Sequence, residues 1–498
     1  MSTRRVNQYP LGVAAAIAGA LVAWHYYRLG LTLSHYDARA HLVVARRIAD
    51  SITPGWQQIG AVWLPFPHLL NALPVQLDLF YRTGLSAVVI SVVAFALATG
   101  SIAAIVRAMT DSSIAGGVAA AVFALNPNVL YLQSTPMTEP LLVALMTLAV
   151  AMLIGWCRAA VATGREAPPA CRAEHIGWTL ALACMTRYEA WPVTACALGA
   201  ASWTLIRGGA SWESARRAVA SIGVYPVVAV LGFVVFSRVV IGEWFPSDFF
   251  VPENKAMNDL SLAAAEIGWG TRALSGPLLV WIGAVGVASL GMIGLFGRRH
   301  AHALVAISLV ATAAIPWMAF YKGHPFRIRY MVPLLAVEAV GAGFVAGMFR
   351  RGRLFVAGLV LAIVAFELRP LDTNAPMVVE AQWDRPNAPV RARVTSCLNG
   401  PGSGEKIMAS MGSLGHYMQE TAADGYAIRD FLHEGNGDIW LAALNDPKPY
   451  AEWVLIEEKA EGGDMLARLS RERPTFLSGY SRVCEGAGLA LYRRRGSP

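Results

Sequence analysis

Charged side chains that could do chemistry lie at the edges of apolar segments in this sequence. The first is Asp37, in LSHYDARAHLVVARRI, which follows an apolar run ending at Leu29. A carboxylate with Tyr36, His and Arg neighbours can take a proton from an attacking hydroxyl or amine if burial or a nearby charge tunes it. Asp is also a favoured N-cap residue, so Asp37 could instead cap the following helix, and the two roles can coexist. We expect Tyr36 to line the same cavity.

A second acidic residue, Glu139, lies between Pro136 and Pro140 in QSTPMTEPLL, near the end of another apolar segment. A charge placed inside a membrane span costs about 2.5 to 3.5 kcal/mol, so a buried Glu139 needs a partner or a water-filled cavity. The alternative is a solvated Glu at the membrane interface. The short turn TRYEAWP adds Arg187 and Glu189, which could face the same cavity or simply pair with each other.

Potentially cationic side chains gather in YKGHPFRIRYMVPLL, which contains Lys322, His324, Arg327 and Arg329. The fork of an Arg guanidinium suits a phosphate group, so this cluster could bind an anion. It could also be a belt of long side chains reaching the lipid headgroups. In PFPHLL, His68 is a lone histidine that we expect to line the cavity without taking part in the reaction.

The composition shows what must position these residues. Of 498 residues, 55% are hydrophobic and 15% are charged, against about 25% charged in an average soluble protein. The apolar residues form blocks about twenty residues long, which is the length that crosses a bilayer as a helix. The net charge of +8 comes from Arg clusters between these blocks. Membrane topology accounts for such clusters, so we exclude a nucleic-acid partner.

We predict a polytopic α-helical membrane protein with about eleven transmembrane helices. The expected spans are residues 11–29, 84–108, 113–131, 136–157, 174–188, 190–207, 217–240, 275–296, 301–320, 330–348 and 353–368. With a cytoplasmic N-terminus, the inner loops hold most Arg residues, as the positive-inside rule requires: Arg4, Arg5, Arg107, Arg158, Arg165, Arg172, Arg207, Arg216, Arg217, Arg298, Arg299, Arg350, Arg351 and Arg353. The cluster from Lys322 to Arg329 falls outside, against this rule, which favours an anion site.

Three stretches are predicted to lie on the outer side. Residues 33–82 hold a helix from Ala38 to Ile52 and a Pro-broken apolar piece, both expected in or near the outer interface, and residues 241–271 form a loop. We divide the chain into a transmembrane domain, residues 1–368, and an extracytoplasmic α/β domain, residues 369–498.

The expected elements of the α/β domain are strands in KIMAS, EWVLIEE and LALYRR and helices in HYMQETA and GDMLARLSRE. Cys397 and Cys484 are its two cysteines and could form a disulfide in an oxidising compartment. No CxxC or HExxH motif is present, so no metal site is predicted.

The order and spacing of several motifs resemble the glycosyltransferase C superfamily, and within it the protein O-mannosyltransferase and lipid A aminoarabinose transferase group. These motifs are HYDARAH, the amphipathic segment after it, the NP to MTEP hairpin, and RIRYMVPLL. They span residues 1 to about 350. One departure is that many members have paired acidic residues in the first loop, whereas Tyr36 and Ala38 flank Asp37 here.

The resemblance implies inverting transfer of a sugar from a polyprenyl-phosphate donor to a protein, lipid or glycan acceptor. The reaction would occur on the outer face of a bacterial-type cytoplasmic membrane. Asp37 then matches the catalytic acidic residue, and Arg327 or Arg329 matches the basic residue near the lipid phosphate. Because Arg can offset the phosphate charge, no metal or other cofactor is required, although a divalent ion is compatible with this chemistry.

A competing hypothesis is a membrane transporter or flippase of a lipid-linked or anionic substrate. Transporters usually place charges near the bilayer midplane and contain inverted repeats. In this sequence the charges gather at one interface and no repeat is visible. The pattern therefore favours the transferase.

Overall fold

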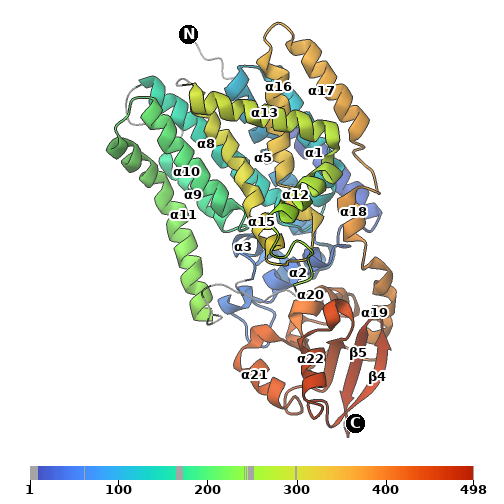
Figure 1. Cartoon of the computed structure of the whole chain (residues 1–498). Coiled ribbons are helices and arrows are strands. Elements are labelled where there is room, and N and C mark those ends of the chain that lie inside the picture. Colours follow the sequence, from blue (N-terminus) through green and yellow to red (C-terminus); the bar gives the residue numbers. More distant parts are fainter. Residues whose placement is uncertain are drawn as a thin grey trace.

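The computed structural model describes residues 9–60, 62–163, 172–240, 242, 244, 252–297 and 300–496. The sequence predictions at Arg4, Arg5, Arg165, Arg298 and Arg299 lie outside these residues, as do residues 241, 243 and 245–251 of the loop predicted from 241 to 271. A large bundle of helices, called here the helical unit (residues 9–381), stands above a smaller unit built on a β-sheet, called the C-terminal unit (residues 388–496) (Figure 1).

Long apolar helices make up the helical unit. Seven described segments are long and apolar enough to cross a membrane: Pro10–Arg28, Leu85–Thr110, Glu139–Ala162, Trp212–Val240, Pro277–Phe296, Ala303–Tyr321 and Ile328–Met348. They correspond to α1 (Tyr9–Arg28), α5 (Leu85–Thr110), α8 (Glu139–Thr163), α11 (Trp212–Val240), α13 (Pro277–Phe296), α14 (Ala303–Ile307) with α15 (Ala314–Tyr321), and the 3-10 turn η5 (Ile328–Met331) with α16 (Leu334–Met348). The chain is a multi-pass membrane protein.

The other four predicted spans are helices that do not meet this criterion. They are α6 (Ser113–Ala124) with α7 (Pro127–Leu132), α9 (Ala173–Cys184), α10 (Ala190–Arg207) and α17 (Arg353–Glu367). The count of eleven therefore stays a prediction.

The predicted loop from 241 to 271 is wrong in its second half, because residues 260–275 form α12 (Leu260–Ser275). Asp259 caps this helix by accepting hydrogen bonds from the backbone N–H groups of Ser261 and Leu262, each at 2.9 Å. The polar cap and the many Ala residues explain why a helix forms in a segment that is too polar to span.

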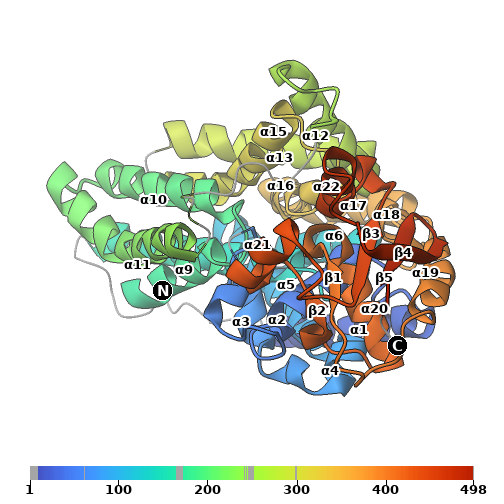
Figure 2. The ribbon, with the colours of Figure 1, turned by 90° about the horizontal axis from the view of Figure 1, so that it is seen from below.

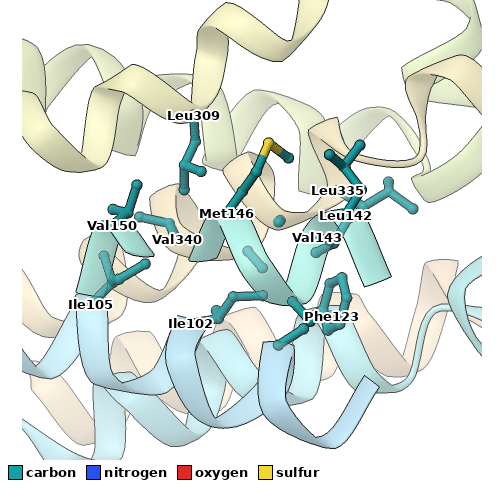
Figure 3. Packing of buried hydrophobic residues seen from close by; sticks show 14 of the residues in the cluster. Ile102, Ile105, Phe123, Leu142, Val143, Met146, Val150, Leu309, Leu335 and Val340 are labelled. Atoms are coloured by element: carbon teal, nitrogen blue, oxygen red, sulfur yellow. The ribbon is translucent and has the colours of Figure 1, made fainter. Parts of the chain in front are cut away.

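The core of the helical unit lies where α5, α6, α8 and α16 pack together. Figure 3 shows this packing, with side chains that are almost fully buried: Ile102, Ile105, Phe123, Leu142, Val143, Val150, Leu335 and Val340. On the other side of α16, small residues allow α13 to approach closely. A Cβ atom on Gly286 would meet the backbone of Gly341, so only glycine fits at this helix crossing.

Short helices cover the end of the helical unit that faces the C-terminal unit. They are α2 (Tyr36–Arg46), α3 (Phe66–Asn71), α4 (Asp78–Thr83) and, later in the chain, α18 (Pro376–Ala381). The predicted helix from Ala38 to Ile52 is therefore present but starts two residues earlier and ends at Arg46. The turn between α16 and α17, which contains Arg350 and Arg351, lies at the opposite end of the helical unit (Figure 1).

The C-terminal unit contains a five-stranded sheet with the order β2-β1-β3-β5-β4. Its strands are β1 (Ile407–Ala409), β2 (Phe431–Leu432), β3 (Trp453–Glu457), β4 (Tyr480–Gly486) and β5 (Leu489–Arg494). β1 pairs in parallel with β2 and β3, whereas β5 is antiparallel to β3 and β4. The predicted strands in KIMAS, EWVLIEE and LALYRR are confirmed as β1, β3 and β5.

The helices of the C-terminal unit are α19 (Ala388–Thr395), α20 (Met411–Glu420), α21 (Asp438–Asn445) and α22 (Met465–Glu472). A disulfide joins Cys397, just after α19, to Cys484 in β4. Residues 369–381 lie beyond the predicted domain boundary, yet α18 packs on α7 and η5 of the helical unit.

The two units meet mainly through α20, which packs against α2 and α4. Figure 2, seen from below, shows α2, α3 and α4 beside the C-terminal unit, with α9, α10 and α11 left uncovered on one side. Helix α2, which contains Asp37, is part of this junction.

Candidate active site

Helix α2 positions the first acidic residue. His35 is its N-cap, and the Nδ1 atom of His35 accepts a hydrogen bond from the backbone N–H of Asp37 at 3.1 Å. The capping alternative for Asp37 is therefore wrong, because His35 takes that role. Asp37 and His41 are four residues apart, so they lie on one face of the helix.

The Asp37 carboxylate forms a buried ion pair with the guanidinium of Arg329, which lies in η5 just before α16. The two side chains are 9% and 8% exposed. Burial alone would raise the pKa of Asp37, but the positive charge of Arg329 outweighs it and holds the pKa below its usual value. The carboxylate is therefore ionised at neutral pH.

A third element, α18, contributes Glu380 to the same cluster. One of its carboxylate oxygens accepts a hydrogen bond from the backbone N–H of Ile328 at 2.9 Å, and the other lies 3.9 Å from Nε2 of His35. Burial raises the pKa of Glu380, but the opposing effect of His35 and Arg329 is larger, so the pKa lies below its usual value. Glu380 thus connects η5, α2 and α18.

A second ion-pair cluster lies at the turn between α9 and α10. One nitrogen of Arg187 is 3.0 Å from the Glu139 carboxylate, and two of its nitrogens donate to Glu189, at 2.7 and 3.0 Å. The Glu139 side chain is fully buried. Both alternatives considered for these residues thus occur together, since Arg187 pairs with its neighbour Glu189 and also with the distant Glu139. A solvated, interfacial Glu139 is wrong.

The two clusters border one cavity of about 150 Å³ at the end of the helical unit that faces the C-terminal unit. Its wall includes His41, Trp63, His68, Thr138, Arg187, Tyr188, Glu189, Pro316, His324, Arg329 and Tyr330. The guanidinium groups of Arg187 and Arg329 lie 5.9 and 5.3 Å from the ring of Tyr330, on which both can stack. This cavity combines positive charge with aromatic and hydroxyl side chains.

Five predicted site residues line this cavity: His68, Arg187, Glu189, His324 and Arg329. Asp37 and Glu139 are not in its wall but pair with arginines that are. Tyr36 faces a different cavity, and its ring stacks on His35 with the centroids 4.7 Å apart.

The predicted cationic cluster is only partly brought together. Lys322 is exposed and outside the cavity wall. His324 lines the cavity, but burial lowers its pKa, so its ring is neutral, and it lies 3.3 Å from the Tyr330 hydroxyl. Arg327 lies on the Asp37 side, where Tyr36 and Glu380 interact with its charge. Arg329 is the cation that connects the cavity to Asp37.

Several residues of the site were not singled out by sequence reasoning. His41 could have been found, because it follows Asp37 by four residues in a helical segment. Tyr330 could also have been found, because it directly follows Arg329 in RIRYMVPLL. Trp63 and Glu380 carry no such signal, since their roles arise from contacts with distant parts of the chain. In the part of the chain that the structure describes, no group of three or more His, Cys, Asp or Glu residues could hold a metal ion.

No family model and no curated protein matches this chain. Among solved structures it is similar to ArnT from Cupriavidus metallidurans bound to undecaprenyl phosphate, with a TM-score of 0.56 and 14% identity over 97% of this chain and 98% of ArnT. It is also similar to the archaeal oligosaccharyltransferase AglB from Archaeoglobus fulgidus in complex with an inhibitory peptide and a dolichol-phosphate. That match has a TM-score of 0.51 and 10% identity over 90% of this chain and 69% of AglB.

The apo form of the Archaeoglobus fulgidus oligosaccharyltransferase gives a TM-score of 0.52 at 11% identity, over 90% of this chain and 70% of that one. At such low identities the likeness is one of fold. ArnT, a lipid A aminoarabinose transferase, and AglB are both glycosyltransferases of the GT-C fold. The resemblance read from the sequence is thus confirmed at the level of the fold, and this chain has the GT-C fold.

Proposed function

We propose that this protein transfers a sugar from a polyprenyl-phosphate carrier to an acceptor on the outer face of the cytoplasmic membrane. The observation that carries the proposal is the buried ion pair between Asp37 and Arg329 at the edge of a polar cavity. Sugar transfer from a lipid phosphate needs a base for the acceptor and positive charge for the departing phosphate. A carboxylate and a guanidinium in contact can supply both.

Arg329 and Arg187 are the residues proposed to bind the donor phosphate. Both line the cavity and both are largely buried, with side chains 8% and 15% exposed. In a site with little water, their charge stabilises the phosphate as it leaves more strongly than it would in solution. Arginine alone can offset this charge, so the proposal requires no metal, and a divalent ion remains compatible with it.

Asp37 is the proposed general base. While it is paired with Arg329, its lowered pKa makes it a weak base. A bound phosphate would compete for the Arg329 guanidinium and so raise the pKa of Asp37 towards a more useful value. The base would then take the proton of an acceptor hydroxyl or amine, the acceptor would form the new bond to the anomeric carbon, and the carrier phosphate would leave. A single displacement of this kind inverts the anomeric configuration.

The proposed orientation has a cytoplasmic N-terminus and an extracytoplasmic C-terminal unit. The disulfide between Cys397 and Cys484 supports it, because such bonds persist in oxidising compartments. The Arg350–Arg353 turn supports it as well, because it lies at the end opposite the C-terminal unit, and basic residues favour the cytoplasmic side. In this orientation the cavity faces the outer interface, where the phosphate of a lipid carrier resides.

Transfer from a radiolabelled polyprenyl-phosphate sugar to membrane acceptors tests the proposal. The Asp37→Asn variant should lose transfer by about 100-fold or more, the usual contribution of a general base. The Asp78→Asn variant is the matched control. Asp78 also lies in the segment of residues 33–82 and pairs with an arginine, Arg46, but its side chain is 59% exposed. It should transfer within about twofold of wild type.

Unchanged transfer by a folded Asp37→Asn protein would remove Asp37 from the mechanism. Substrate-dependent flux into liposomes without a covalent product would contradict the transferase altogether and favour a transporter or flippase.

A further inference from the structure

Two buried histidines form a chain of hydrogen bonds at the wall of the cavity. Nδ1 of His41 lies 3.0 Å from Nε2 of His68, and Nδ1 of His68 lies 3.2 Å from the backbone carbonyl oxygen of Leu64. The two side chains belong to α2 and α3 and are 6% and 1% exposed. The general base and the phosphate site proposed above use neither of them.

The chemistry of these groups fixes where each proton lies. A carbonyl oxygen can only accept, so Nδ1 of His68 must be the donor to Leu64. Burial lowers the pKa of His68 to about 3, so the ring is neutral and its Nε2 carries a lone pair. Nε2 therefore accepts, and Nδ1 of His41 must donate to it.

The same logic fixes the state of His41. Its pKa is lowered, first by burial and then by His68, Arg329 and Arg187, so this ring is also neutral. With the proton on Nδ1, the other nitrogen, Nε2, carries a lone pair. Within the described ranges of the chain, Nε2 of His41 has no hydrogen-bond partner, although the residue lines the cavity.

Trp63 holds this arrangement in place. Its ring lies 4.2 Å from that of His41 and 5.9 Å from that of His68, measured between centroids. The three rings line the same cavity as Arg187 and Arg329. Nε2 of His41 is not one of the buried atoms without a partner among the described residues, so it is open to a donor from the cavity.

A lone pair of this kind selects what can bind. The phosphodiester that joins the sugar to its carrier has negative oxygens and no hydrogen-bond donor, so it cannot bind the neutral Nε2 of His41 and is left to the arginines. A polyprenyl chain also offers no donor. A sugar attached to that phosphate is the part of the donor molecule that carries hydroxyl groups, and its linkage to the phosphate keeps it within the same cavity.

We propose that Nε2 of His41 accepts a hydrogen bond from a hydroxyl group of the donor sugar, which makes His41 a residue that selects the donor. This inference rests on the proposed function. It assigns the sugar rather than the acceptor to His41, because His41 shares the cavity with Arg187 and Arg329, whereas Asp37 lies outside the cavity wall.

Binding to protein in lipid nanodiscs tests the inference with two kinds of probe. The first is undecaprenyl phosphate, and the second is undecaprenyl phosphate loaded with glucose, galactose, mannose or arabinose. Wild type should bind at least one loaded carrier more tightly than the bare carrier. His41→Phe keeps the ring against Trp63 but removes the lone pair, so it should bind the bare carrier normally and lose about tenfold in affinity for the preferred loaded one.

The control is His302→Phe, which alters a buried histidine that is not in the cavity wall and should change neither affinity. If His41→Phe keeps the preference for the loaded carrier, or loses affinity for both carriers equally, the inference is wrong. It is also wrong if wild type binds no loaded carrier more tightly than the bare one. Sugar-dependent binding through His41 without any transfer would instead overturn the proposed function and leave the inference standing.

A measurement on wild type covers the case in which His41→Phe does not fold. In protein labelled with ¹⁵N-histidine, Nε2 of His41 should be unprotonated at neutral pH, and its resonance should shift when the preferred loaded carrier is added but not with undecaprenyl phosphate. A protonated Nε2, or a shift that is the same with both carriers, would overturn the inference.

Discussion

Two buried clusters of charge flank helix α2, and they differ in how completely their hydrogen bonds are made. At the junction of the two units, Arg391 donates to both oxygens of Asp384 and both oxygens of Glu420, over 2.7 to 2.9 Å. Glu420 also pairs with Arg39 at 2.9 Å. This junction cluster uses its polar atoms internally.

The cluster at the candidate active site leaves polar atoms unused. Among the described residues, Nε of Arg329 and one oxygen of Glu139 are buried without a partner, and Nε2 of His35 and one oxygen of Glu380 meet only each other, 3.9 Å apart. Native proteins rarely leave such groups unmatched, so each one calls for a ligand or water. The cavity at the junction cluster is the larger, about 260 Å³ against about 150 Å³. Unused hydrogen-bonding capacity, rather than cavity size, therefore distinguishes the candidate active site from the junction cluster.

The largest effect is expected for the loss of Arg391. An Arg391→Met substitution leaves Asp384 and Glu420 buried without their main partner, which should lower the free energy of unfolding by about 3 kcal/mol. This loss of stability lies at the low end of the range for breaking a buried ion pair, because Arg39 still pairs with Glu420. Denaturant unfolding in detergent measures it, and transfer per folded molecule should stay within about twofold of wild type. A stable Arg391→Met protein without transfer would place the junction cluster in the active site.

An Arg329→Lys substitution should act on transfer more than on stability. Lysine can keep the ion pair with Asp37, but it lacks the fork needed to bind a phosphate at the same time. We expect transfer to fall roughly 10- to 100-fold. The matched variant Arg391→Lys should retain transfer. Equal losses of transfer in Arg329→Lys and Arg391→Lys would contradict a functional difference between the two clusters.

The junction cluster should also make stability depend on pH through His416, which lies 3.4 Å from Asp384. Burial, helped by the charge of Arg391, lowers the pKa of His416 to about 4. Between pH 6.5 and 4 the unfolded chain therefore binds a proton that the folded chain does not, and stability falls as the pH falls, by up to about 1.4 kcal/mol per pH unit.

His416→Phe should remove this part of the slope while keeping a ring near Tyr36. Unfolding curves at pH 5, 6 and 7 measure the difference from wild type. Asp37 does not affect this measurement. Its lowered pKa stabilises the folded protein, and that stabilisation is lost only below about pH 4. An unchanged slope would show that His416 is protonated in the folded protein.

The smallest effect is expected for Lys322→Ala. The side chain is exposed and outside the cavity wall, so transfer should change by less than about twofold. The same transfer assay measures it. A tenfold loss would mean that the phosphate contacts a wider surface than Arg187 and Arg329.

Much of the fold follows from local patterns. Blocks of apolar residues predicted the long helices, and short apolar runs predicted β1, β3 and β5. β2 has two residues, too few for a pattern, and the exposed side chains of β4 do not alternate clearly. Helix α12 was not predicted although Asp259 is a favoured N-cap residue, because the proline-containing segment EWFPSDFFVPENK before it indicated a loop.

Part of the candidate site was predictable from the sequence, because burying a charged side chain without a partner is energetically unfavourable. Asp37, Glu139, Arg187 and Arg329 stand out because charges beside apolar segments need partners, and these four do pair with one another or with close neighbours. Their pairing could not be predicted, since Asp37 and Arg329 are brought together only by the packing of η5 against α18 and α2. Glu380 depends on the same packing and has no pattern of its own.

Helix α2 is bound to both halves of the molecule at once. Near its start, Asp37 is tied to Arg329, and two residues later Arg39 is tied to Glu420 on α20. A helix of eleven residues does not bend easily, so it works as a lever with one arm in each half. A tilt of the C-terminal unit that moves α20 would therefore pull on the helix that carries Asp37, so the position of the candidate base is coupled to the position of that unit.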